Sequence, residues 1–390
     1  MIKKDFVDIR NSNCNEKNKM KILHIPNYYP PNMGGIEKTA SDCVRAFAHH
    51  FAPEQKVICM NRGARITKTD YDDKTEIIRC ASPLKLFSQS LSIEFPKRLG
   101  RLMKEMEPDA VVLHWPNPFT AFWLMRHAER KFRFILYWHS DIVKQKMLGN
   151  LLKPLTEKTA ARADVIIATS PDYVEGSSIL SKYKKKVVIV PSCIDETLFQ
   201  KTEETDRLAQ KIRKENAGKT ICFAFGREVP YKGFEYLYKA LSYVDESVKL
   251  IHGKNLTQDE LIAYLTACDI FCFPSITKNE AFGLALAEGM YFGNPAVTFS
   301  IPGSGVNYVS LNGITGIECP NRDSKAFAEA INKLAKDRKL RKTLGEQARK
   351  RVVNNFLYEQ YAERICDRRI IPYTANDGDS EICERNRKTS

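Results

Sequence analysis

The chain has 390 residues, of which 43% are hydrophobic, and a formal net charge of +14. This length accommodates two domains of ordinary size, each with its own core. No apolar run approaches the roughly 20 residues that a membrane-spanning helix needs, and residues 1–19 are too polar for a signal peptide. The sequence therefore predicts a cytoplasmic globular protein whose positive charge attracts an anionic partner.

Residues 1–19 have no hydrophobic period, which predicts a disordered extension. The run KILHIP at residues 21–26 predicts a strand, and apolar residues at helical spacing predict a helix over residues 36–50. Gly34 and Gly35 lie in the loop between them. Strand, glycine-containing loop and helix form the opening unit of a doubly wound domain, in which ligands bind at the carboxyl ends of the strands.

Further apolar runs in the first half of the chain predict short strands, and helical segments separate most of them. This alternation is typical of a parallel sheet. His114 and His139 each end one of the runs, which makes them candidates to line the ligand-binding edge. The runs cover residues 56–60, 110–114, 133–139, 164–170 and 186–191.

Residues 95–106, FPKRLGRLMKEM, combine basic and apolar side chains in a helical pattern. Such a helix is able to lie on an anionic bilayer. The same pattern fits a surface helix that packs on the core and keeps its basic face in water. A nucleic-acid partner is not predicted, because no recognised nucleic-acid motif accompanies the positive charge.

A second sheet begins with the strand TICFAFG at residues 220–226, so the domain boundary is expected near residues 192–218. Cys268 and Cys272 are the nearest pair among 11 scattered cysteines, and they read as small buried residues rather than metal ligands or a disulfide. A helical run at residues 323–356 is expected to break near Leu344 and Gly345. The predicted parts are an N-terminal domain at 20–195, a C-terminal domain at 196–365 and a polar tail at 366–390.

Two carboxylates stand on either side of a predicted helix start. The run DIFCFPS at residues 269–275 predicts a buried strand, so a helix should begin near Gly283, with Glu280 before it and Glu288 roughly two turns inside. Unpaired N–H groups of the first turn, together with the helix dipole, would bind a phosphate. On spacing alone, the stretch also fits an ordinary amphipathic helix. The phosphate would meet the backbone of Phe282, Gly283 and Leu284.

The block GREVPYKG places Arg227 after a strand and Lys232 before a helix. Such cations are able to pair with two phosphates and to stabilise the charge that builds on a leaving diphosphate. Taken by themselves, two cations in a loop also fit solvated surface charges.

The E-x7-E spacing of Glu280 and Glu288, after a strand that ends in Pro-Ser, resembles the signature of the retaining glycosyltransferases of family 4. The block with Arg227 and Lys232 and the motif WHSDI at His139 match the same family, and the resemblance covers roughly residues 20–363. It implies the α/β GT-B fold, in which two Rossmann-like domains with parallel sheets face each other across a cleft. The N-terminal domain would hold the acceptor and the C-terminal domain the nucleotide-sugar.

The resemblance also implies roles for single residues. His139 would reach the donor sugar, Glu280 would orient a hydroxyl of that sugar, and Glu288 would bind the ribose hydroxyls. The loop with Gly34 and Gly35 would approach the donor phosphate and the acceptor. His114 and Asp141 are further candidates to line the cleft, or they hold loop geometry.

The implied reaction displaces a nucleoside diphosphate with retention at the anomeric carbon, without a metal or other cofactor. The donor would be GDP-mannose or a UDP-hexose, and the acceptor a glycan or a polyprenyl-diphosphate-linked glycan of a surface polysaccharide. The protein would act in the cytoplasm, at the inner face of the plasma membrane. The D-x-D spellings at Asp70 and Asp377 follow no buried strand and read as coincidence.

One departure from the family favours an alternative. Residues 248–271 leave no room for an additional strand and helix that family members have there, so the second sheet is expected to be one strand smaller. The alternative function is a non-catalytic relative that binds a phosphorylated ligand. A nucleotide-sugar epimerase of the same fold finds no support in the E-x7-E block. The family also ends in a helix that returns to the N-terminal domain, which residues 359–370 would begin.

Overall fold

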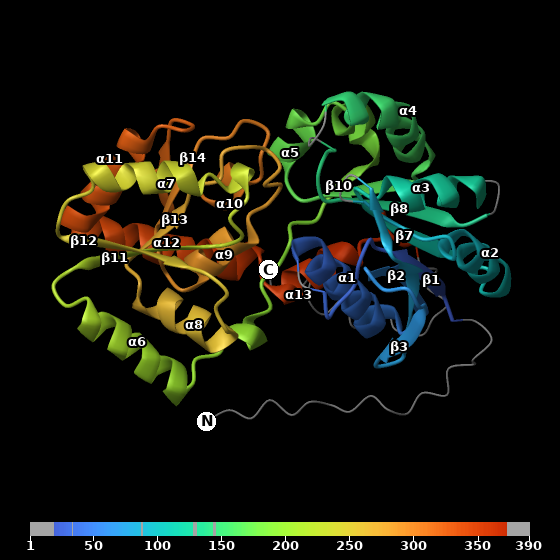
Figure 1. Ribbon diagram of the computed structural model, residues 1–390, viewed down its shortest axis with the longest axis horizontal. Coiled ribbons are helices and arrows are strands. Elements are labelled where there is room, and N and C mark those ends of the chain that lie inside the picture. The colour runs from blue at the N-terminus through green and yellow to red at the C-terminus, as the bar shows by residue number, and fades with distance from the viewer. Residues whose placement is uncertain (1–18, 33, 87–88, 128–130, 143–145, 373–390) are drawn as a thin grey trace, which may run out of the picture.

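A computed structural model describes residues 19–32, 34–86, 89–127, 131–142 and 146–372. Residues 1–18 of the predicted N-terminal extension and residues 373–390 of the predicted tail therefore lie outside the described residues. Figure 1 shows two α/β bodies side by side, joined where the chain passes between them.

The first body is built on a sheet of eight strands within the described residues, in the order β10-β9-β8-β7-β1-β2-β4-β3. The strands pair in parallel, except that β3 runs antiparallel to β4 at one edge. Central strands such as β7 are buried along their whole length, because helices cover both faces of the sheet. The strands are β1 (Lys21–Ile25), β2 (Glu54–Arg62), β3 (Lys68–Asp72), β4 (Thr75–Ser82), β7 (Ala110–Trp115), β8 (Arg133–Trp138), β9 (Val165–Ala168) and β10 (Val187–Ile189).

Short connections and helices complete this body. A two-stranded hairpin of β5 (Leu84–Leu86) and β6 (Gln89–Leu91) stands apart from the main sheet. The α-helices are α1 (Gly35–Phe51), α2 (Phe95–Glu105), α3 (Pro118–Leu124), α4 (Lys146–Arg162) and α5 (Pro171–Gly176), and the 3₁₀ turns are η2 (Met125–His127), η3 (Leu180–Lys186) and η4 (Glu196–Phe199).

The second body is built on a five-stranded parallel sheet in the described part of the chain, in the order β12-β11-β13-β14-β15. Its strands are β11 (Thr220–Phe225), β12 (Val248–Gly253), β13 (Ile270–Phe273), β14 (Ala296–Phe299) and β15 (Gly316–Cys319). Its helices are α6 (Glu203–Glu215), α7 (Phe234–Ala240), α8 (Gln258–Ala267), α9 (Leu284–Tyr291), α10 (Val306–Val309), α11 (Ser324–Lys336) and α12 (Arg338–Asn355), with 3₁₀ turns η5 (Pro230–Lys232) and η6 (Leu241–Tyr243).

Each sheet therefore carries its own hydrophobic core, in the arrangement of the GT-B fold that the resemblance implies. Residues 248–269, all of which the structure describes, form β12 and α8 and no additional strand or helix before β13. This segment is therefore as short as the sequence indicates. The exact domain limits stay a prediction.

The chain passes between the two bodies twice, at neighbouring points. Ile194 donates its N–H to the carbonyl of Phe356, at 2.8 Å. Beyond this point α13 (Tyr358–Ile365) returns to pack against α1, as the resemblance implies. Ile370 and Ile371 are buried in the core of the first body, so the tail begins later than the predicted residue 366.

The predicted break in the last helical run is wrong. The chain breaks at Asp337, whose carboxylate caps α12 by accepting from the N–H of Leu340 at 2.8 Å. Leu344 and Gly345 lie inside α12. A Cβ on Gly345 would overlap the carbonyl oxygen of Gly293, so glycine serves a close approach of backbones rather than a helix end.

Helix α2 settles the two readings of residues 95–106. Phe95, Leu99 and Met103 are fully buried in the core of the first body. The apolar face is therefore not available to a bilayer, and the reading as a surface helix with a solvated basic face is confirmed.

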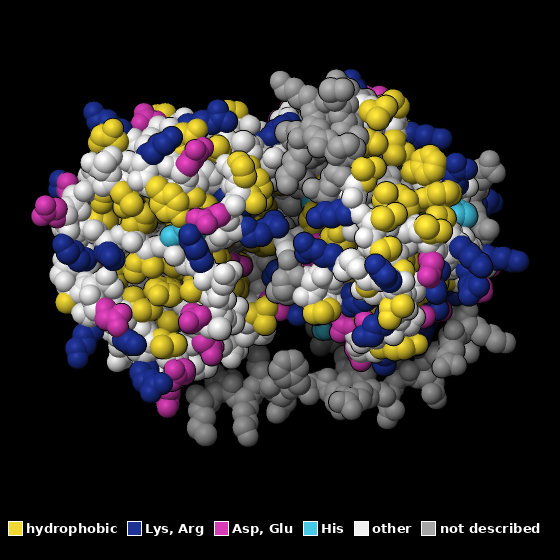
Figure 2. Space-filling model, viewed as in Figure 1, with side chains coloured by type: hydrophobic (Ala, Val, Ile, Leu, Met, Phe, Trp, Pro, Cys, Tyr) yellow, Lys and Arg dark blue, Asp and Glu magenta, His cyan; other side chains and the backbone are white. Residues whose placement is uncertain are grey.

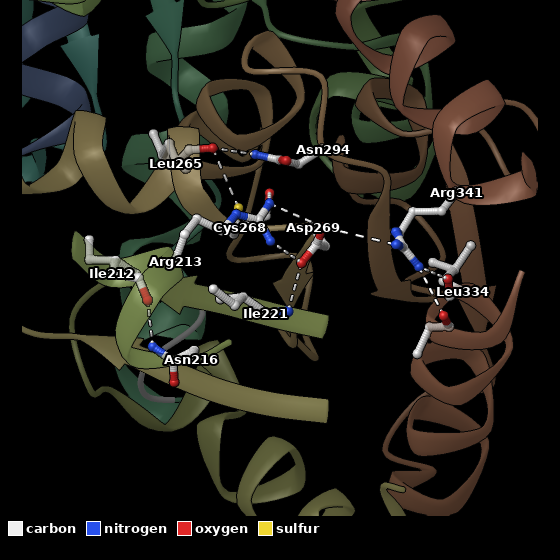
Figure 3. Close-up of polar contacts among 11 residues, drawn as sticks. Ile212, Arg213, Asn216, Ile221, Leu265, Cys268, Asp269, Asn294, Leu334 and Arg341 are labelled. Atoms are coloured by element: carbon white, nitrogen blue, oxygen red, sulfur yellow. Dashed lines mark hydrogen bonds and ion pairs between the residues drawn. The ribbon is translucent and has the colours of Figure 1, made fainter. Parts of the chain in front are cut away.

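At the amino end of β13, a network joins four elements of the second body (Figure 3). Arg213 of α6 donates to both carboxylate oxygens of Asp269, at 2.6 and 3.1 Å. Asp269 also accepts from the N–H of Ile221 on β11, at 2.8 Å, and Arg341 of α12 lies 4.0 Å away. These bonds fix α6 and α12 to the amino ends of β11 and β13, opposite the carboxyl ends of the strands where ligands bind.

Candidate active site

The amino ends of two helices meet where the bodies face each other (Figure 1). A Cβ built on Gly35, the first residue of α1, would lie 3.6 Å from the Leu284 side chain at the start of α9. The N-cap residues Gly34 and Gly283 provide no side-chain cap. The positive ends of two helix dipoles thus converge with unpaired N–H groups, which is an environment suited to an anion.

Helix α9 begins one residue after Gly283, as predicted. Gly283 has φ of 96°, which a residue with a side chain rarely adopts. Glu288 is the fifth residue of α9, little more than one turn inside, so the predicted two turns are wrong. The Phe282 side chain packs edge-on against Phe356 in the core, with 5.3 Å between the ring centroids. Only the backbone of Phe282 therefore remains to face the start of α9.

Glu280 and Lys232 form an ion pair in the loop before α9. Their side chains are only 12% and 14% exposed. The Glu280 carboxylate also accepts from the Ser275 hydroxyl at 3.2 Å, and the Lys232 ammonium lies 5.1 Å from the centre of the Phe273 ring. The Glu280 carboxylate is therefore fixed by a cation and a hydroxyl group.

Gly233 makes this proximity possible. Its φ is 65°, and a Cβ there would overlap the carbonyl oxygen of Pro274. The turn that carries Lys232 can therefore lie against the end of β13 only with glycine at this position.

Glu288 lies opposite the α1 helix of the first body. It is half-buried, and burial raises the pKa of its carboxyl to about 7, although the positive charges of Lys38 and Lys232 lower it. Lys38 belongs to α1 and also donates to Asp42 at 2.7 Å. Glu288 is therefore poised between its charged and neutral forms near neutral pH.

His139 follows β8 and is stacked on Tyr137, with 4.4 Å between ring centroids. Its Nε2 lies 3.0 Å from Nδ1 of His114. Burial lowers the pKa of His139 to about 3, so the ring is neutral at physiological pH. His114 is 1% exposed and lies behind His139, where it orients the ring.

Protein donors bind both carboxylate oxygens of Asp141. Its Oδ1 accepts from Trp138 Nε1 at 3.1 Å and from the Ser177 hydroxyl at 2.8 Å. Its Oδ2 binds the Lys278 ammonium of the second body at 2.9 Å. Of the two readings of Asp141, these contacts favour the one in which it holds loop geometry.

Arg227 is exposed at the end of β11. Its positive charge reaches Glu37 on α1, whose carboxyl pKa is raised by burial and lowered by Arg227 and Arg62. The Glu37 carboxylate folds back over Gly34, where a Cβ would overlap it. The sequence analysis does not predict Glu37, Lys38 or Lys278 as site residues. Glu37 and Lys38 lie in the first turn of α1, next to Gly34, so their position in the helix is a signal that marks them. No local pattern marks Lys278.

A cavity of about 430 Å³, which Glu280 does not line, lies between α5 and the loop after β14. Gly176 lines it from the first body and Ser304 from the second, and the Ser304 hydroxyl donates to the carbonyl of Glu280. Its size is that of ordinary small-molecule sites.

Two family models match the chain in succession. Residues 33–198 match "Glycosyltransferase Family 4", and residues 245–351 match "Glycosyl transferases group 1". The chain belongs to glycosyltransferase family 4. The second match contains Glu280 and Glu288, and the first contains Gly34, Gly35 and His139.

This glycosyltransferase is similar along most of its length to two curated enzymes. It is 28% identical to O-antigen chain mannosyltransferase C of Escherichia coli, over 91% of this chain and 98% of that one. It is 26% identical to the D-rhamnosyltransferase WbpZ of Pseudomonas aeruginosa, over 85% and 91% of the two chains.

Solved structures agree on the fold. Sucrose-phosphate synthase from Thermosynechococcus elongatus superposes with a TM-score of 0.71 at 16% identity, covering 89% of this glycosyltransferase and 97% of that chain. HepE from Anabaena, solved with UDP and glucose, superposes with a TM-score of 0.67 at 16% identity, covering 89% and 98%. At this identity the likeness concerns the fold alone.

Proposed function

We propose that this glycosyltransferase moves a hexose from a nucleotide-sugar to a glycan acceptor, with retention at the anomeric carbon. One observation carries the proposal: the uncapped amino ends of α1 and α9 meet beside Lys232, between Glu280 and Glu288. The N–H groups and cations suit a diphosphate. The two carboxylates suit sugar hydroxyls on one side and ribose hydroxyls on the other.

In the proposed reaction, the bond between the anomeric carbon and the diphosphate oxygen breaks and the acceptor oxygen bonds to the same face of that carbon. The acceptor proton passes to the leaving diphosphate. Lys232, Arg227 and the helix ends stabilise the charge that develops on that group. Glu280 holds a donor-sugar hydroxyl, and neutral His139 is able to donate or accept a further hydrogen bond.

The two curated relatives transfer mannose and rhamnose, by their names, and the first acts on an O-antigen chain. This similarity supports a mannose-type donor and a role in polysaccharide biosynthesis, so GDP-mannose is the donor to test first. UDP-hexoses follow it.

The experiment incubates the protein with a panel of nucleotide-sugars and a glycan acceptor and measures diphosphate release. We expect release from one donor, and a fall of roughly 100-fold or more in kcat for Glu280→Gln and Lys232→Met. Lys336→Met, at an exposed ion pair with Asp245, serves as the control. Release that neither site substitution reduces would refute the site, and no release would favour the non-catalytic alternative.

We further propose that the acceptor side contacts an anionic bilayer through an aliphatic patch, defined as Ile66, Leu84, Leu86 and Ile93. These side chains are 54–91% exposed, and the exposed cations Arg65, Lys85 and Lys97 lie beside them in the sequence. This charge suits anionic lipid headgroups. Among the helices of the described residues, none has the length and hydropathy of a membrane span.

Two hydrogen bonds support the continuity of this patch and its position at the carboxyl edge of the sheet. The Thr67 hydroxyl donates to Glu94 at 2.6 Å, which brings the segments of Ile66 and Ile93 together. Tyr28, just after β1, bonds Ser90 of β6 at 2.6 Å, so the hairpin lies at the carboxyl edge of the sheet.

The test is flotation with phosphatidylglycerol-containing vesicles. We expect the wild type to bind and the double substitution Leu84→Ser with Ile93→Ser to bind at least about tenfold less. Leu241→Ser, which removes a 47% exposed leucine from the second body, should bind like the wild type. Equal binding by all three proteins would refute the patch.

A further inference from the structure

Two loops that carry candidate catalytic residues are joined across the interface of the bodies. Lys278 lies two residues before Glu280, and Asp141 lies two residues after His139. The Lys278 ammonium binds Asp141 Oδ2 at 2.9 Å. The ion pair thus connects the segment of Glu280 in the second body with the segment of His139 in the first.

Both ends of this bridge are held rigidly. Asp141 Oδ1 is fixed by Trp138 and Ser177, and its N–H donates to the Tyr173 hydroxyl at 2.7 Å, which leaves Oδ2 directed to the lysine. Lys278 lies in a turn closed by the N–H of Glu280 and the carbonyl of Thr277, at 3.1 Å. Movement of the lysine therefore moves Glu280 with it.

Lys278 reaches the first body twice and is not its loop's sole attachment. Its ammonium also donates to the carbonyl of Gly176 at the end of α5, at 2.8 Å. On the other side of Glu280, the carbonyl of Ala281 accepts from the Thr169 hydroxyl at 3.0 Å. The Ala281 side chain is buried in the core of the first body.

Glu280 is therefore bound to both bodies at once. Its carboxylate is fixed by Lys232 and Ser275 of the second body, while the backbone on either side is fastened to the first. The ion pair is partly shielded, with Lys278 32% and Asp141 14% exposed, so bulk water screens it less than a surface pair.

We propose that Lys278 is a positioning residue, whose bond to Asp141 sets the separation of Glu280 and His139 when the two bodies come together. This proposal rests on the proposed function, in which both residues meet the donor sugar. Lys278 itself touches no reacting atom. When the two bodies approach each other, its ion pair with Asp141 gives Glu280 and His139 one defined relative position.

The test compares Lys278→Gln, Asp141→Asn and the double variant with the wild type. Asp141→Asn retains an oxygen for Trp138 and Ser177. We expect each single variant to lose about 10- to 100-fold in kcat with the active donor, the order produced by misplacement of a reacting group by roughly 1 Å. The double variant should be no worse than the weaker single variant, because the two residues act as one unit.

Two further measurements separate positioning from a general structural role. Calorimetric affinity for the nucleoside diphosphate should change less than about threefold, because the anion-binding groups remain. The radius of gyration from small-angle scattering should rise in Lys278→Gln. Lys184→Gln, which removes an exposed ion pair with Glu175 near the same interface, should match the wild type in every measurement.

Wild-type kcat in Lys278→Gln, or single-variant losses that multiply in the double variant, would overturn the proposal. If the wild type releases no diphosphate from any donor, the proposed function fails instead. In that case scattering still decides, since an unchanged radius of gyration in Lys278→Gln would refute the bridge between the bodies.

Discussion

At the scale of single residues, Glu288 is a group whose charge near neutral pH depends on the fold. In an unfolded chain its carboxyl has the ordinary pKa of 4.5, whereas burial raises it to about 7 in the folded protein. The folded state therefore binds the proton more tightly. Stability associated with this group is fully present below pH 4.5 and is lost as the pH rises through about 7.

Glu288→Gln tests this linkage. At pH 8 the substitution removes a desolvated charge and should stabilise the protein by about 1–3 kcal/mol. At pH 5 it should be nearly neutral, because the wild-type carboxyl is already protonated. Thermal unfolding at both pH values measures the difference. Equal effects at the two pH values would contradict the raised pKa.

His139 leads to a different expectation for the pH dependence of activity. Its pKa of about 3 lies far below the working range, so it stays neutral where Glu288 titrates. An acid limb in the rate profile near pH 7 would therefore belong to Glu288. The sequence places both residues in motifs but says nothing of their burial, which depends on residues distant in the chain.

At the scale of elements, Asp269 connects more of the second body than its place just before the short strand β13 indicates. Arg213 of α6 and the N–H of Ile221 both depend on its carboxylate. We expect Asp269→Ala to destabilise the protein by about 2–4 kcal/mol, because it leaves a buried donor and a cation unpaired. Denaturant unfolding measures this cost.

Asp245→Ala provides the matched control. Its ion pair with Lys336 is exposed, with Lys336 71% accessible, so its loss should change stability by less than about 0.5 kcal/mol. If both alanine variants lost the same stability, the network of Figure 3 would have no special role.

Hydrophobic patterns predict most of the buried strands and the amphipathic helices. The strands at β1, β7, β8, β11 and β13 and the helix start at Gly283 follow the predicted positions. The edge strand β3 and the outer strand β5 of the hairpin are not predicted because their residues are mostly exposed, and β4 is not predicted although most of its residues are buried. The helical run breaks at Asp337 and not at the predicted Gly345. A glycine is typical of a helix end, whereas Gly345 allows the close approach of the Gly293 backbone, a contact that the sequence does not reveal.

At the scale of the whole molecule, the two bodies approach closely enough to need glycine on both sides. A Cβ on Gly176 would overlap the Cα of Gly303, and Gly303 has φ of 72°. Figure 2 shows the two bodies in contact along a seam lined by cations. Closure that excludes water suits glycosyl transfer, because hydrolysis of the donor competes with it.

Gly176→Val should hold the bodies apart. We expect kcat to fall by about 100-fold, with a small change in thermal stability, because neither core contains the substituted side chain. Gly100→Ala in α2, whose Cβ would lie 3.8 Å from His127, should retain activity. An active Gly176→Val would show that transfer does not need this approach.

The sequence by itself determined the family and the two largely parallel sheets, and it predicts the residues of the proposed anion-binding half of the site. These rest on local signals: hydrophobic period, glycine at helix starts, and cations and carboxylates at fixed spacing. Only the tertiary structure decided how the halves meet. The bond of Lys278 to Asp141 spans 137 positions of the chain, and the neutral state of His139 follows from burial beside His114. Burial and long-range contact depend on chain segments that no local pattern relates.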